Sequence, residues 1–151
     1  MYKEDITKLS VRKIKNLTKK ANGQVLFSAC APCQPFSSQN KQKSDKDERR
    51  ALLDTLHPFI KSCLPDYILL ENVPGLQRIE KGPFTRFINF LETLGYYFDA
   101  DVKNAVDFGV PQRRKRLVLI ASKHGPITLP EETHGKGRIP YKTVWQAIRF
   151  C

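Results

Sequence analysis

Cys33 is the residue in this sequence whose type and setting best suit covalent chemistry. It stands in the run Ala-Pro-Cys-Gln-Pro-Phe-Ser over residues 31–37. Prolines fix φ and remove backbone donors, so Pro32 and Pro35 predict a rigid loop that can aim one side chain. A thiolate is a strong nucleophile, whereas a buried cysteine is inert and packs as a small apolar residue. The flanking prolines favour the nucleophile over the packing role.

Glu71 is a second residue that could take part in a reaction. It follows the apolar run 67–70, which predicts a buried strand with polar groups at its carboxyl end. A carboxyl group in such a place can share a proton or a hydrogen bond with a substrate. The alternative is a structural carboxylate that pairs with a nearby arginine. The sequence around Glu71 is compatible with both roles.

Arg114 and Arg116 belong to a dense basic run, Gln-Arg-Arg-Lys-Arg, over residues 112–116. On a strand, residues two apart point to the same face, so these two arginines are expected to share one side. Arg116 directly precedes the apolar run 117–120, which predicts that its side chain is drawn inward. An inward arginine needs an anionic or carbonyl partner. A solvated run of charges is the alternative.

The elements that must position these residues follow from the apolar pattern. We predict strands at 24–29, 67–70, 97–105 and 116–122, and helices at 50–64 and 84–94. Pro58 is expected to kink the first helix or to delay its regular part, and Gly95 to cap the second. This order predicts an α/β fold with a largely parallel sheet and an antiparallel pair at one edge. Because sites lie at the carboxyl ends of parallel strands, Cys33 and Glu71 are expected at one crevice.

Charge and composition limit the partners. The chain has 26 Lys+Arg against 15 Asp+Glu, a formal net charge of +11, which favours a polyanion such as nucleic acid. No apolar run approaches the ~20 residues of a membrane-spanning helix, and the lysine-rich N-terminus lacks the pattern of a signal peptide. The histidines lack the spacing of zinc ligands, so no metal site is expected. We expect a cytoplasmic protein, of the cytosol or nucleoid, with no membrane partner.

Three segments together resemble the ordered motifs of the DNA (cytosine-5)-methyltransferases. Residues 27–37 resemble the nucleophile loop of that family, residues 71–73 its Glu-Asn-Val motif, and residues 104–116 its Gln-x-Arg-x-Arg motif. Residues 143–148 resemble the stretch before the target-recognition domain. Each motif alone is modest, whereas all three in this order are specific to the family.

The resemblance implies a Rossmann-like methyltransferase sheet and a reaction on double-stranded DNA. The target cytosine is flipped out of the duplex, because its ring edge cannot be reached inside the stack. The family pattern makes Cys33 the nucleophile that adds to carbon 6, and Glu71 the group that bonds ring nitrogen 3. Arg116, with Arg114, contacts the cytosine carbonyl or its backbone.

The same resemblance implies S-adenosyl-L-methionine as the methyl donor and places Asp5, Pro32 and Leu52 at that cofactor. The Phe-x-Gly-x-Gly turn of the family, its ribose-binding acidic residue and its target-recognition domain are absent from the sequence. We therefore expect residues 1–151 to form a single partial catalytic domain, the second half of the fold, with weak or no binding of the cofactor by itself. A complementary chain would supply the missing motifs.

Two other functions stay open. One is a non-catalytic DNA-binding remnant. The other is a thiol redox protein, because Cys30 and Cys33 form a Cys-x-x-Cys after a strand. In thioredoxin-like folds that motif opens a helix, whereas here Pro35 and the polar stretch 37–47 follow. Replacing Cys30 by serine separates the two chemistries, since a redox pair loses its function and a methyltransferase is expected to be little affected.

Overall fold

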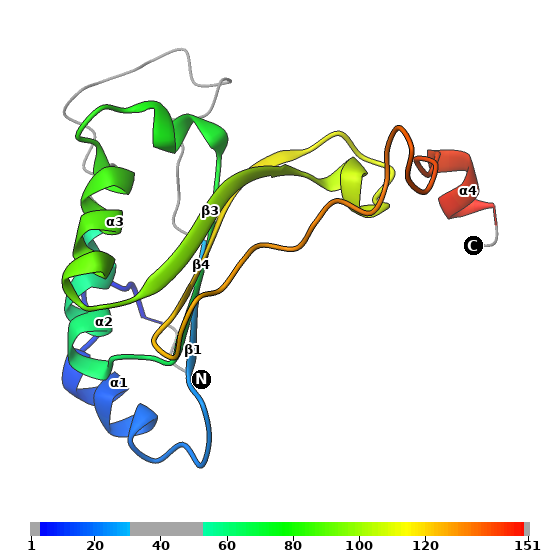
Figure 1. Ribbon diagram of the computed structural model, residues 1–151. Coiled ribbons are helices and arrows are strands. Elements are labelled where there is room, and N and C mark those ends of the chain that lie inside the picture. The colour runs from blue at the N-terminus through cyan, green and yellow to red at the C-terminus, as the bar shows by residue number, and fades with distance from the viewer. Residues whose placement is uncertain (1–3, 31–52, 150–151) are drawn as a thin grey trace.

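The computed structural model describes residues 4–30 and 53–149 (Figure 1). The elements in chain order are α1 (Val11–Thr18), β1 (Leu26–Ala29), η3 (Asp54–Leu56), α2 (His57–Cys63), β2 (Tyr67–Asn72), η4 (Pro74–Arg78), α3 (Pro83–Thr93), β3 (Tyr97–Asn104), η5 (Ala105–Phe108), β4 (Lys115–Ser122) and α4 (Val144–Ile148). The four expected strands are present, each within two residues of its predicted bounds, and the helix expected at 84–94 is α3. Of the helix expected at 50–64, η3 and α2 cover residues 54–63, and residues 50–52 lie outside the described residues. Cys33, Pro32 and Leu52 lie outside the described residues.

In the described part of the chain, four strands form one sheet in the order β1-β2-β4-β3. β1 pairs with β2 in parallel, and β4 runs antiparallel to both β2 and β3. Three strands therefore share one direction, and β3 with β4 forms the antiparallel pair expected at one edge. The placement of β4 between β2 and β3 was not predicted. It brings the basic run at the start of β4 beside the carboxyl end of β2.

The hydrophobic core lies between the sheet and the helices α2 and α3, which cover the same face (Figure 1). Ile60 of α2 and Phe87 of α3 are buried against alternate residues of the central strands, such as Leu70 and Leu119. Each such side chain stabilises the fold by roughly 1.5–3 kcal/mol when fully buried. This packing uses one face of β2 and β4, so the intervening residues of these strands point to the opposite face.

The predicted helix breakers lie at the helix ends. α2 begins at His57 with Pro58 in its first turn, where the missing N–H has no helical partner to lose. Pro58 thus delays the regular helix, which η3 precedes. α3 is followed by Gly95 with φ of 73°, a left-handed conformation that glycine adopts without a steric penalty.

A cluster around Asp66 ties together the end of the sheet opposite Glu71. The Val25 amide donates to Asp66 Oδ2 at 2.7 Å, and His124 Nε2 lies 2.6 Å from Asp66 Oδ1. The Tyr96 hydroxyl donates to the Pro65 carbonyl at 2.5 Å, and burial raises the pKa of Tyr96 far above its ordinary value. These bonds join the chain before β1, the start of β2 and the chain after β4.

The chain after β4 turns back along the sheet face that the helices leave free, and α4 lies beyond the sheet (Figure 1). The Leu129 amide donates to Asp99 Oδ2 at 2.8 Å, which attaches this segment to β3. Further along, the Tyr141 hydroxyl donates to Asp107 Oδ1 at 3.0 Å and attaches it to η5. No helix within the described ranges is both long enough and apolar enough to span a bilayer.

Candidate active site

Glu71 lies inside β2 and not beyond it, because pairing with β4 extends the strand to Asn72. The predicted strand ended at residue 70, and that boundary was wrong by two residues. Leu70 and Asn72 are buried on the helix side, so alternation directs Glu71 to the opposite face. Its side chain is 36% exposed there, which leaves the carboxylate accessible to a ligand.

The main partner of Glu71 is Arg116. Arg116 Nε lies 2.6 Å from Glu71 Oε1, and the arginine also donates from a terminal nitrogen to the Lys115 carbonyl at 2.8 Å. Glu71 is paired with Val118 in the β2–β4 register, so Arg116 is a diagonal neighbour two residues away, within reach of a long side chain. Arg116 thus has an anionic partner, as expected, but its side chain lies on the open face with Glu71 and not toward the core. The same ion pair is also what a purely structural role of Glu71, as the partner of a nearby arginine, would require.

Cys30 is a second partner of Glu71, and sequence reasoning missed it. Its thiol donates to Glu71 Oε2 at 2.8 Å. Ala29 at the end of β1 is paired with Leu70, which places the next residue along β1 beside the next along β2. Phe27 and Ala29 pack on the core, so alternation along the strand could have predicted that Cys30 points to the open face. The contact with Glu71 depends in addition on the register between β1 and β2, which the sequence does not show.

Asn72 and Val73, the other members of the Glu-Asn-Val motif, shape the chain just after Glu71. The Asn72 side chain is 2% exposed, and its Oδ1 accepts from the Val73 amide at 2.9 Å. Pro74 then begins η4. The motif therefore places one polar side chain toward the core, where it fixes the turn, and one toward the open face.

Arg114 lies just before β4 and is exposed. Its backbone carbonyl accepts from the Ala105 amide at 3.0 Å. Within residues 4–30 and 53–149 no hydrogen bond or ion pair is formed by its side chain. The structure therefore brings Arg116, but not Arg114, to Glu71.

Asp5 lies before α1, and its interactions are local. Its Oδ1 accepts from the Thr7 hydroxyl at 2.7 Å and from the Thr7 amide at 2.8 Å. The Thr7 hydroxyl and then the Thr7 amide lower the pKa of Asp5 below its ordinary value, so the group is ionised near neutral pH. None of these contacts joins Asp5 to the cluster of Glu71, Arg116 and Cys30.

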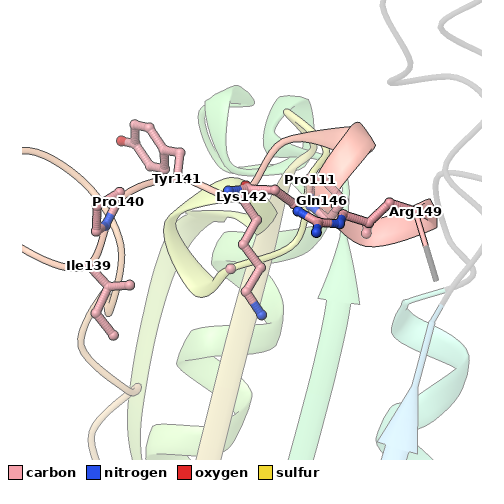
Figure 2. Close-up of a pocket in the computed structure, with 9 residues that line it drawn as sticks. Pro111, Ile139, Pro140, Tyr141, Lys142, Gln146 and Arg149 are labelled. Atoms are coloured by element: carbon pink, nitrogen blue, oxygen red, sulfur yellow. The ribbon is translucent and has the colours of Figure 1, made fainter.

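Two cavities open where the turn after β3 meets the chain before α4. One, of about 590 Å³, is lined by residues that include Pro111, Lys142 and Arg149 (Figure 2). The other, of about 570 Å³, is lined by residues that include Arg113 and again Lys142. Two basic side chains border each hollow, and the other lining residues are apolar or uncharged.

Comparison with known proteins matches residues 1–147 to the family described as C-5 cytosine-specific DNA methylase. The Type II methylase M.HgiDII of Herpetosiphon aurantiacus is 39% identical over 128 residues, which are 84% of this chain and 35% of the relative. The Type II methyltransferase M1.BsuMI of Bacillus subtilis is 41% identical over 112 residues, 74% of this chain and 26% of the relative. The chain therefore spans about a third or less of the length of these relatives.

The fold is similar to that of the methyltransferase EhMeth of Entamoeba histolytica. The two structures superpose with a TM-score of 0.65 over 81% of this chain and 38% of that protein, at 23% identity. At this identity the likeness concerns the fold, and it confirms a Rossmann-like methyltransferase sheet.

Proposed function

The chain belongs to the C-5 cytosine-specific DNA methylase family, and from this premise we propose that it carries the cytosine-activating part of a DNA (cytosine-5)-methyltransferase. The observation that carries the proposal is the Glu71 carboxylate. It stands accessible at the carboxyl end of β2, held by Arg116 from one neighbouring strand and by Cys30 from the other. The nucleophile segment follows β1 directly in the sequence.

The proposed partner is double-stranded DNA, from which a cytosine is flipped out of the stack. Its phosphates suit the net charge of +11 and the basic cavities near Lys142. The setting we propose is the bacterial cytosol or nucleoid.

Several residues of this chain have separate roles at the cytosine ring. The Cys33 thiolate forms a bond from sulfur to carbon 6, and the displaced electron pair moves toward carbon 5 and the ring. As the ring accepts this electron pair, ring nitrogen 3 takes up a proton from water and donates it in a hydrogen bond to the Glu71 carboxylate. This bond stabilises the adduct, Arg116 orients Glu71, and the proton is given back when Cys33 is eliminated. Arg116 and Arg114 also contact the cytosine carbonyl or its backbone. Loss of the carbon-5 proton and cleavage of the sulfur–carbon bond regenerate Cys33.

Asp5 fits a role at S-adenosyl-L-methionine. Its carboxylate is ionised and exposed, and within the described ranges only Oδ1 is bonded, to Thr7, so Oδ2 can accept from an amine. We propose that Asp5, Pro32 and Leu52 contact the cofactor, which when bound supplies an electrophilic methyl group for carbon 5.

We propose that residues 1–151 act as one partial catalytic domain, and that a complementary chain supplies the remaining motifs of the family. The second candidate function is a non-catalytic DNA-binding remnant, which the basic borders of the two cavities favour. The two functions predict the same affinity for DNA and differ only in chemistry at the cytosine.

Hydrogen exchange at carbon 5 separates these functions without a methyl donor. Addition of Cys33 to carbon 6 lets carbon 5 accept a solvent proton, and elimination then releases the original hydrogen. We expect the chain to release tritium from DNA labelled at cytosine carbon 5, and Cys33→Ser to abolish the release without loss of DNA binding. DNA binding with no release by the parent chain would support the remnant. Release that persists in Cys33→Ser would overturn the assignment of the nucleophile.

A further inference from the structure

The geometry points to Cys30 as a positioning residue: we propose that its thiol holds Glu71 in the orientation that receives the cytosine ring. This inference rests on the proposed function and adds to it a residue for which the family motifs assign no role. The redox reading of the Cys-x-x-Cys treats the same thiol as an electron carrier. The contact with Glu71 gives it a different task.

The two oxygens of Glu71 are held from opposite sides. Arg116, on β4, bonds Oε1 at 2.6 Å, and Cys30, at the end of β1, bonds Oε2 at 2.8 Å. β2 lies between these two strands in the sheet. The Glu71 carboxylate on β2 is therefore bonded by one residue from each neighbouring strand, and these two bonds together set the plane of the carboxylate.

A single partner would not fix that plane. The terminal torsion of a glutamate is broad and roughly two-fold, so a carboxylate bonded only through Oε1 can still turn about its last bond. Because Glu71 is 36% exposed, packing alone does not immobilise it. The second bond, from Cys30, removes this freedom before the substrate arrives, and such preorganisation lowers the barrier of a reaction that needs one geometry.

Oε2, the oxygen that Cys30 bonds, is the one that we assign to the cytosine ring. Oε2 is bonded at the end of β1, and Cys33 is three residues further along the chain. Oε1 is committed to Arg116 on the other side. A carboxylate oxygen can accept more than one hydrogen bond, so Oε2 keeps its bond to Cys30 while it accepts from the protonated ring nitrogen 3 of a bound cytosine.

The contact depends on the side chain present at position 30. In the sequence, Cys30 stands between Ala29 and Ala31. A glycine or an alanine there has no donor for Glu71. A serine hydroxyl donates as well as a thiol does or better. Cys30→Ala and Cys30→Ser therefore form a matched pair that separates loss of the bond from loss of the sulfur.

The test compares tritium release from carbon 5 at saturating DNA for the parent, Cys30→Ala, Cys30→Ser and the control Ser28→Ala. Ser28 lies on the same strand and faces Leu69 instead of Glu71. We expect Cys30→Ala to slow release about 3- to 10-fold, the effect of one weak hydrogen bond, at an unchanged half-saturating DNA concentration. Cys30→Ser should return to within about two-fold of the parent, and Ser28→Ala should equal it.

A double-mutant cycle shows whether Cys30 acts through Glu71. In a Glu71→Gln background, Cys30→Ala should cause no further loss of release. The inference is overturned if Cys30→Ala matches the parent, if Cys30→Ser is as slow as Cys30→Ala, or if the loss is equally large in the Glu71→Gln background. Thermal unfolding of each variant identifies any loss that comes from folding.

A measurement without chemistry keeps this inference separate from the proposed function. The ¹³C resonance of the Glu71 carboxyl should move in Cys30→Ala and move less in Cys30→Ser, with no change in Ser28→Ala. If the parent releases no tritium, the proposed function fails, while the carboxyl resonance still tests the bond. A resonance unmoved by Cys30→Ala would overturn the inference even if the chain proves active.

Discussion

Arg116 reaches across from β4 to β2, and its Nε lies 2.6 Å from Glu71 Oε1. The two residues are 45 positions apart in the sequence. The antiparallel pairing of β2 with β4 brings them together. This pair joins two of the three motifs on which the family resemblance rests. The sheet register is therefore responsible for the geometry of this pair.

Replacing Arg116 by alanine is expected to reduce function far more than stability. The side chains of Arg116 and Glu71 are 26% and 36% exposed, and ion pairs in such settings contribute only about 0–1 kcal/mol to folding. We expect tritium release from cytosine carbon 5 to fall at least about 10-fold, with partial recovery in Arg116→Lys, because lysine keeps the charge but not the planar fork. The neighbouring Lys115→Ala removes a charge on the same strand and should retain release. Equal losses in both alanine variants would mean that only net charge matters.

Asp66 is expected to make the fold sensitive to acid. The Val25 amide, followed by His124, lowers the pKa of Asp66 below its ordinary value. A carboxyl group with a depressed folded pKa stabilises the fold above its unfolded pKa, and this stabilisation is lost as pH falls through the folded pKa. The urea midpoint of the parent should therefore drop below about pH 4, near the ordinary pKa of aspartate.

In Asp66→Asn the midpoint should be lower at pH 7 and should depend less on acid than in the parent. Glu131→Gln removes an exposed carboxyl in the segment after β4 and serves as the matched control. An unchanged acid profile in Asp66→Asn would show that another carboxyl group is responsible.

His57 is expected to act in a different pH window. Its ring stacks on Phe90 with centroids 4.1 Å apart, and burial, the largest cause, lowers its pKa below 6.5. The unfolded chain then binds a proton more readily than the native one, so stability is full above about pH 6.5 and declines as pH falls through the folded pKa. NMR titration of the ring should show the depressed pKa, and His57→Phe should remove the decline in the urea midpoint that begins below about pH 6.5. A decline that persists in His57→Phe would assign it to another group.

The local pattern of the sequence predicted the elements well, for physical reasons that can be named. The stripe that includes Phe87 and Leu91 requires one buried helix face, and the structure buries both residues. Pro58 fixes its φ and lacks an N–H, which suits the first turn of α2. Gly95 adopts the left-handed conformation after α3 without a steric penalty.

The sheet order and the contacts of Glu71 could not be predicted in this way. Position 71 lies at the edge of an apolar run, and nothing local shows that β4 will pair there and extend β2 to Asn72. Cys30 looked like half of a redox motif because Cys33 follows it by three residues, and nothing in the sequence indicated that its thiol bonds Glu71. The extension of β2 and the contact between Cys30 and Glu71 both depend on the register between strands that are distant in sequence, which a local pattern does not encode.

DNA binding is expected to depend on the basic borders of the two cavities. Arg113 and Lys142 line the cavity of about 570 Å³, and Lys142 lines its neighbour as well. A contact with a phosphate releases condensed counterions, so Arg113→Ala or Lys142→Ala should each weaken binding and reduce the slope of log K against log salt by about 0.9. Lys20→Ala is the charge-matched control, because Lys20 follows α1, at the opposite end of the molecule from α4 (Figure 1). If Lys20→Ala lowers affinity and slope as much as Lys142→Ala does, the DNA responds to net charge, and the cavities do not form the interface.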